Sequence, residues 1–324
     1  MTPKAFIEER LARLSAPVEV PAFKDDAERA AYITKALLSK KFRKYAVDAE
    51  FGPHLENVLK NAFEKQGPIQ LVQPFGGYKL WRLSEAPEAD WAELFSMMFY
   101  AAWLKPVVAA YAPGAVFDFS SDDVVVERMN HIPKADTAAY KRSFEEAIAF
   151  LAPHLPKNLK FTFTPVGSRY TEEEFNAELD ARMAAWQKEN GGTLPEASAA
   201  EKKMMDLNAR KTPEEEADPD YYGKNKLMHD SYMAVEKRRP YNRAPDKILA
   251  FTKQLPKGIA LGTTKTSIAK YWAGVGALSR RGDSYIETVL SPDQLATAET
   301  SAEWVPLSFP GLSGKNFQNI RVIG

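Results

Sequence analysis

The stretch Ile69-Gln70-Leu71-Val72-Gln73-Pro74-Phe75-Gly76-Gly77 decides the predicted fold. It is a short apolar run ended by a proline and two glycines, which is typical of a buried strand that leads into a loop. A strongly apolar segment follows from Trp91 to Ala110, and its bulky side chains predict a helix buried on more than one face. A strand, a loop and a buried helix in this order indicate the α/β class.

The rest of the chain continues to alternate between strand and helix patterns. We expect a hairpin-like pair of strands at 115–119 and 124–128, because β-branched and aromatic residues flank the turn-forming stretch Ser120-Ser121-Asp122-Asp123. A helix at 136–151 and a strand at 159–164 follow. In the last quarter we expect strands at 247–252, 258–261, 284–290 and 319–323, and a helix at 264–278 that contains Gly274 and Gly276 and ends near Arg280-Arg281-Gly282-Asp283.

Three units are predicted from changes in composition. Residues 1–66 have helical patterns, with Asp25 and Asp26 as caps and Gly67-Pro68 as the break that ends them. Between 171 and 245, 28 of the 75 residues are charged while Met, Leu and Tyr still recur, which indicates a charged helical insertion. Residues 67–170 and 246–324 would then form one α/β catalytic domain.

The composition excludes several functional classes. The chain has 324 residues with 43 Lys+Arg and 43 Asp+Glu, so it has no surplus of positive charge with which to neutralise nucleic-acid phosphates. It has no cysteine, which excludes disulfide scaffolds, thiolate metal sites and cysteine nucleophiles. No apolar run is long enough to span a membrane and the N-terminus is too charged for a secretory signal, so we expect a cytoplasmic protein.

Two loops that follow predicted strands have the composition of anion sites. One contains Lys79 and Arg82 beside Tyr78 and Trp81, after a glycine pair that permits close approach of a ligand. The plainer interpretation is a turn with solvated cations and core aromatics. The other loop opens a predicted helix, where free N–H groups, hydroxyls and one lysine favour a phosphate or carboxylate, although simple helix capping has the same signature. Its residues are Gly262, Thr263, Thr264, Lys265, Thr266 and Ser267.

Asp122, Asp123 and His131 are the candidates for acid–base chemistry. Paired aspartates at a strand end can act as a base, anchor an amine or hold a divalent metal, although adjacent aspartates also satisfy ordinary turn hydrogen bonds. His131 lies among polar residues, whereas the four histidines show no zinc-ligand spacing. The dinucleotide fingerprint is absent, so neither a metal nor another cofactor is predicted.

The segment from Ile69 to Phe150 resembles the isonitrile (isocyanide) synthase family, which includes proteins of pyoverdine and dityrosine biosynthesis. The resemblance rests on the order of a strand, Pro74-Phe-Gly-Gly-Tyr-Lys79, Pro87-Glu-Ala-Asp90-Trp-Ala-Glu93, a long helix, Tyr111-Ala-Pro-Gly114 and Ser121-Asp122-Asp123. It implies a Rossmann-like sheet flanked by helices. It also implies condensation of an aromatic amino acid's amino group with a pentulose phosphate, whose carbonyl carbon becomes the isonitrile carbon, without a redox cofactor.

The residues and the resemblance together predict an enzyme that acts on a small anionic metabolite, either a sugar phosphate or an amino acid. Lys79, Arg82 and the loop at 262–267 would bind the anion, while Asp122, Asp123 and His131 would carry the chemistry. One alternative is a metal-dependent nucleotidyl- or glycosyl-transferase with the aspartates on the metal, which a chelator would inactivate. Another is a non-catalytic protein that binds a partner through residues 171–245.

Overall fold

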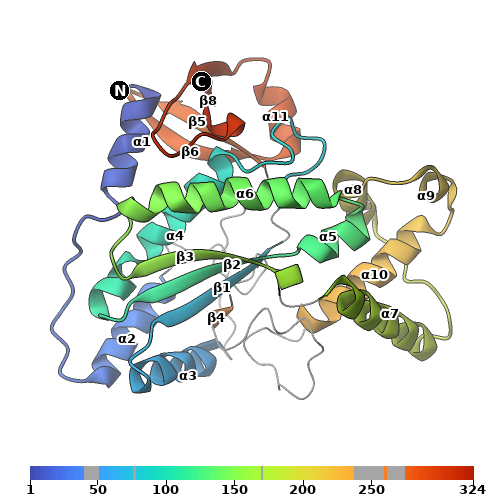
Figure 1. The fold of residues 1–324 in the computed structure, drawn as a ribbon, viewed down its shortest axis with the longest axis horizontal. Coiled ribbons are helices and arrows are strands. Elements are labelled where there is room, and N and C mark those ends of the chain that lie inside the picture. Colours follow the sequence, from blue (N-terminus) through green and yellow to red (C-terminus); the bar gives the residue numbers. More distant parts are fainter. Residues whose placement is uncertain (40–50, 76–77, 169–170, 237–258, 261–273) are drawn as a thin grey trace.

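Four parallel strands form the central sheet, sheet A, of the computed structural model, which describes residues 1–39, 51–75, 78–168, 171–236, 259–260 and 274–324 (Figure 1). The strand order is β3-β2-β1-β4, so the stretch that decided the prediction lies in the interior of the sheet. Because all neighbours are parallel, their carboxyl ends meet at one edge. The strands are β1 (Ile69–Phe75), β2 (Ala115–Ser121), β3 (Leu159–Pro165) and β4 (Ile259–Ala260).

The last quarter of the chain forms a second, mixed sheet, sheet B, in the order β6-β5-β8-β7. The strands predicted at 284–290 and 319–323 are confirmed. The helix predicted at 264–278 is wrong over 275–278, which belong to β5, while 264–273 and the strand predicted at 247–252 lie outside the described residues. The elements are β5 (Val275–Arg281), β6 (Ser284–Leu290), α11 (Pro292–Ala298), β7 (Glu303–Pro306), η6 (Lys315–Phe317) and β8 (Asn319–Ile323).

Two glycines allow strand β5 to pack closely against its neighbours. A Cβ on Gly274 would lie 2.1 Å from the carbonyl oxygen of Leu290, and one on Gly276 would lie 2.5 Å from the backbone nitrogen of Ala92. The glycines therefore allow the close backbone packing that we predicted, but along a strand. The predicted helix end is instead the hairpin turn between β5 and β6, where Gly282 has a φ of 56°.

Helix α4 (Trp91–Ala110) lies between the two sheets and is buried along most of its length, as its composition predicts. On one side, the ring of Tyr100 lies 4.6 Å from that of Phe117 in β2. On the other side, Nε1 of Trp91 donates a hydrogen bond of 2.9 Å to the carbonyl oxygen of Asn319 in β8. One continuous apolar core therefore joins sheet A, α4 and sheet B.

The helical N-terminal segment is confirmed. Asp25 caps the second helix as predicted, since its side chain accepts a hydrogen bond from the backbone nitrogen of Glu28. The third helix packs on β1 and β4, and the second packs on α4 (Figure 1). These helices are α1 (Pro3–Ala12), α2 (Asp26–Leu37) and α3 (Phe51–Glu64).

Helix α5 (Asp123–Asn130) occupies the place where we predicted the second strand of a hairpin, so that prediction is wrong. Its valines favour a strand locally. In the folded chain, Val124, Val125 and Met129 instead share one helical face and pack against Phe175 in a second apolar cluster. Tertiary packing has therefore overridden the local preference.

The described part of the charged segment, residues 171–236, is mostly helical, as predicted, and packs on α5 (Figure 1). None of the helices in the described part of the chain has the length and apolar character needed to cross a membrane. The division into three units stays a prediction. The remaining elements are α6 (Lys134–Leu151), η2 (Ala152–His154), η3 (Val166–Ser168), α7 (Glu172–Glu189), α8 (Ala199–Asn208), α9 (Pro213–Ala217) and α10 (Tyr221–Glu236).

Candidate active site

The carboxyl edge of sheet A brings together polar side chains from separate loops. Tyr78 follows β1, and Asp122 and Asp123 follow β2 directly. The hydroxyl groups of Tyr78 and Ser121 lie 3.1 Å apart, so the two loops are in contact. Ligands of open α/β sheets bind beyond this edge, and the predicted aspartates therefore lie where a substrate is expected.

The two aspartates have different partners. Asp122 Oδ1 accepts a hydrogen bond of 2.8 Å from the hydroxyl group of Tyr232 in α10. Asp123 Oδ1 accepts one of 2.9 Å from the backbone nitrogen of Gly167, just after β3. Both aspartates are half-buried, and burial raises the pKa of the Asp123 carboxyl although backbone N–H groups oppose the shift. Asp123 is thereby moved towards the pKa range of a general base.

Tyr78 is a further candidate site residue, although its sequence pattern by itself favours a core aromatic. Its ring lies 5.0 Å from the ring of Tyr140 in α6, and it is half-buried. Burial and then the nearby Asp123 carboxylate raise the pKa of the Tyr78 hydroxyl, which therefore stays protonated as a hydrogen-bond donor. Its position directly after the Gly76-Gly77 pair was the sequence signal that could have identified it.

Lys79 has partners other than the anion that we predicted for it. Its ammonium group is buried and lies 2.8 Å from Asp90 Oδ1 and 3.0 Å from Glu93 Oε2, and it also donates to the carbonyl oxygen of Gly274. The side chains of Asp90 and Glu93 also form the capping box of α4. Lys79 therefore joins the loop after β1 to α4 and to the start of sheet B, and we no longer assign it to ligand binding.

We expect Glu93→Gln to remove a pH dependence of stability. Burial raises the pKa of the Glu93 carboxyl above its ordinary value of 4.5, and the Asp90 carboxylate adds to this effect against the opposing Lys79 charge. Below the pKa that this carboxyl group has in the unfolded state, its contribution to stability is complete. The contribution is lost as the pH rises through the higher pKa of the folded state. Urea unfolding between about pH 5 and pH 9 should show a smaller fall in midpoint for the variant. If the urea midpoint falls equally in both proteins over this pH range, Glu93 is not the group with the raised pKa.

Arg82 is exposed, and its guanidinium group lies 4.6 Å from the ring centroid of Trp81. It therefore remains accessible to an anion.

The predicted loop residues Gly262, Thr263, Thr264, Lys265, Thr266 and Ser267 lie outside the described residues. The strand that precedes them, β4, pairs in parallel with β1 through Ala260 and Val72, so it ends at the same edge as the aspartates.

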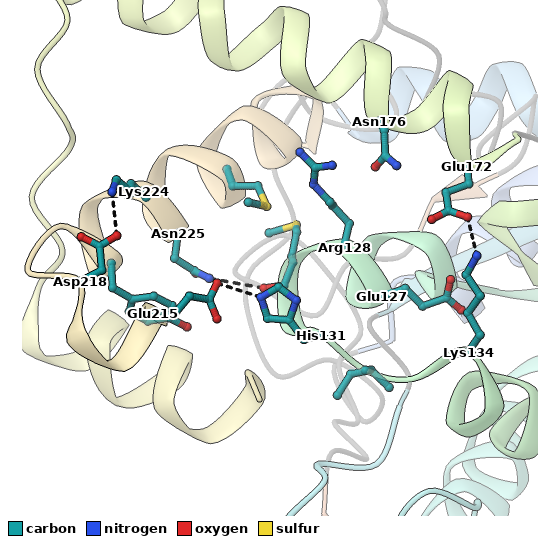
Figure 2. Close-up of a pocket in the computed structure, with 14 residues that line it drawn as sticks. Glu127, Arg128, His131, Lys134, Glu172, Asn176, Glu215, Asp218, Lys224 and Asn225 are labelled. Atoms are coloured by element: carbon teal, nitrogen blue, oxygen red, sulfur yellow. Dashed lines mark hydrogen bonds and ion pairs between the residues drawn. The ribbon is translucent and has the colours of Figure 1, made fainter. Parts of the chain in front are cut away.

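His131 lies away from the aspartates, at the opposite end of α5. It follows the last residue of this eight-residue helix, which is about 12 Å long. Its Nε2 lies 2.8 Å from Oε1 of Glu215 (Figure 2). The predicted grouping of Asp122, Asp123 and His131 is therefore not formed in this structure, and we leave His131 out of the chemistry proposed below.

A cavity of about 510 Å³ lies beside His131, between α5 and helices α7, α9 and α10 (Figure 2). Glu127, Lys134 and Glu172 contribute to its lining, but neither Asp122 nor Asp123 does.

In the part of the chain that the structure describes, no three His, Asp or Glu side chains gather as the ligands of one metal ion would.

No family model matches the chain, and no curated protein matches it. Among solved structures, it is similar to the PvcA protein from Pseudomonas aeruginosa, with 16% sequence identity and a TM-score of 0.56. The match covers 91% of this chain and 100% of that chain. At this identity the likeness shows the fold.

Proposed function

We propose that the chain is an enzyme similar to isonitrile synthases, which joins the amino group of an amino acid to the carbonyl carbon of a ketose phosphate. The observation that carries this proposal is the position of Asp122 and Asp123 beside the Tyr78 loop, at the carboxyl edge of a parallel sheet. The distant likeness to PvcA and the family resemblance of residues 69–150 support the same reaction class.

The carboxylates provide the charge that an ammonium group needs. Asp122 would anchor the substrate ammonium group, with the Tyr232 hydroxyl holding the carboxylate in place. Asp123, whose pKa burial raises, would accept one proton from this group and so free the nitrogen lone pair. The nitrogen then attacks the carbonyl carbon. Its two remaining protons pass to the former carbonyl oxygen, which leaves as water, and an imine remains.

The phosphate of the second substrate requires cations. Arg82 and the predicted loop at 262–267 are the remaining candidates, since Lys79 is engaged by Asp90 and Glu93. The loop follows β4, which ends at the same edge as the aspartates. This arrangement would place the phosphate near that edge.

The test is the effect of Asp123→Asn on product formation from an aromatic amino acid and a pentulose phosphate, followed by mass spectrometry. We expect a fall in rate of about 100-fold, because asparagine cannot accept the ammonium proton. The thermal shift caused by the amino acid should persist in this variant and weaken in Asp122→Asn. The exposed Asp283 offers a matched control, and Asp283→Asn should leave both measurements unchanged. Product formation at the original rate by Asp123→Asn would refute the proposal, as would the lack of any product or thermal shift with the original protein.

A further inference from the structure

The proposed reaction creates negative charge at an edge that already carries carboxylates. When the amino nitrogen attacks the carbonyl carbon of the ketose, the carbonyl oxygen becomes negative. Asp122 follows β2 at the same edge, so its charge repels that oxygen. Enzymes stabilise an oxygen of this kind with hydrogen-bond donors that are fixed in place before the reaction. The reaction therefore requires a donor beside the aspartates.

Three donors near this edge are already engaged. The hydroxyl group of Tyr232 donates to Asp122 at 2.8 Å, and the backbone nitrogen of Gly167 donates to Asp123 at 2.9 Å. The Lys79 ammonium group is buried and held by two carboxyl groups. These three groups therefore serve the protein's own carboxyl groups.

The Tyr78 hydroxyl group differs from these donors. It lies 3.1 Å from the hydroxyl group of Ser121, and either group can donate in this contact. Ser121 is fully buried and immediately precedes Asp122, so it fixes the Tyr78 hydroxyl group beside the aspartates. When Ser121 donates, the proton of Tyr78 can point towards a ligand.

Packing holds the Tyr78 ring in place and leaves part of the side chain exposed. The ring centroid lies 5.0 Å from that of Tyr140, which is fully buried and whose hydroxyl group donates to Glu93 at 3.2 Å. Tyr78 is half-buried, so it is the member of this tyrosine pair that a ligand can reach. Burial and then the Asp123 carboxylate raise the pKa of the Tyr78 hydroxyl, which therefore keeps its proton for a hydrogen bond.

We propose that the Tyr78 hydroxyl group is a catalytic hydrogen-bond donor, which stabilises the oxygen of the ketose carbonyl while the amino nitrogen attacks its carbon. As the C–N bond forms and the C=O bond becomes a single bond, the negative oxygen accepts this hydrogen bond. Tyr78 keeps its own proton, because the two protons that convert the oxygen to water come from the nitrogen. Ser121 is a positioning residue for Tyr78. The inference rests on the proposed function, since it assigns a residue to that reaction.

The test is steady-state kinetics of Tyr78→Phe with an aromatic amino acid and a pentulose phosphate, followed by mass spectrometry. We expect kcat to fall about 100-fold, which is the usual cost of removing one such donor. The KM for the pentulose phosphate should change by less than about threefold, because the lost hydrogen bond is strong only in the transition state.

Tyr32→Phe is the matched control. Tyr32 is also half-buried, but it lies in α2, at the opposite end of sheet A from α5 (Figure 1). Its replacement should leave kcat and KM unchanged.

A second measurement tests the same hydrogen bond if Tyr78→Phe fails to fold. Tyrosine at position 78 is replaced by a fluorotyrosine with the fluorine beside the hydroxyl group, which keeps the hydroxyl and makes it a stronger donor. A pentulose phosphate with carbon-13 at its carbonyl is bound without amino acid, and its carbonyl signal is followed by NMR. We expect this signal to lie further downfield in the fluorotyrosine variant than in the original protein.

The possible failures are distinguishable. An unchanged kcat in folded Tyr78→Phe, while Asp123→Asn loses activity, would overturn the inference and leave the proposed function in place. A raised KM together with a lower urea midpoint would assign Tyr78 to the fold and also overturn it, as would identical carbonyl signals in the fluorotyrosine variant and the original protein. The lack of any product with the original protein would remove the proposed function, and the inference with it.

Discussion

Replacement of Lys79 by alanine is expected to lower the free energy of unfolding by about 3–5 kcal/mol. The Lys79 ammonium group is the buried cation that faces the carboxyl groups of Asp90 and Glu93, at 2.8 and 3.0 Å. All three side chains are at most 5% exposed, so water cannot replace the lost charge. Urea unfolding of the variant and the original protein, monitored by far-ultraviolet circular dichroism, measures the difference.

Two further variants show whether buried charge is the cause. Lys65 is exposed, and Lys65→Ala should change the free energy of unfolding by no more than about 0.5 kcal/mol. Combining Lys79→Met with Asp90→Asn and Glu93→Gln replaces all three ionisable side chains and retains a capping side chain at position 90, so it should recover most of the loss. A loss below about 1 kcal/mol in Lys79→Ala would contradict the buried ion cluster.

The partners of Lys79 illustrate a limit of sequence reasoning. The Lys79 ammonium group donates to the carbonyl oxygen of Gly274, 195 positions further along the chain. A lysine beside aromatic residues has the same local pattern whether it binds a ligand or enters a buried cluster. Only the packing of sheet B against α4 distinguishes these cases.

The parallel sheet was more predictable because its signals are local. Ile69 begins a short apolar run, and the proline and glycines after Val72 mark its end without any distant contact. The position of the aspartates at the end of the next strand was also predictable from local signals, although we expected a hairpin turn there and the structure has the start of α5. Their partners were not, because Tyr232 lies 110 positions from Asp122.

The wrong prediction of a strand at α5 has the opposite cause, because a distant contact and not a local signal decides this segment. The run Val124-Val125-Val126 has a strand preference by itself, and the helix forms because its apolar face meets the helical insertion. The insertion was identified by composition alone, which carries no information on what it packs against. The prediction therefore lacked the contact that decides this segment.

Gly276→Ala is expected to lower the free energy of unfolding by about 3 kcal/mol, at the upper end of the usual cost of overpacking. The added Cβ would lie 2.5 Å from the backbone nitrogen of Ala92 and 2.6 Å from the carbonyl carbon of Trp91. These are backbone atoms at the start of α4, so no change of side-chain rotamer can relieve the clash. Any shift of β5 would also strain the 2.9 Å hydrogen bond from the Gly276 nitrogen to Asp90 Oδ2.

The control is Gly67→Ala, since a Cβ at Gly67 would meet no atom within 4 Å. It should leave the urea midpoint nearly unchanged, or raise it slightly by restricting the unfolded chain. If Gly276→Ala behaves like this control, β5 does not pack against the start of α4, and the ion cluster of Lys79 and Asp90 loses its support as well. If it shows the expected loss while Gly67→Ala does not, β5 packs closely against the start of α4, beside the ion pair of Lys79 and Asp90.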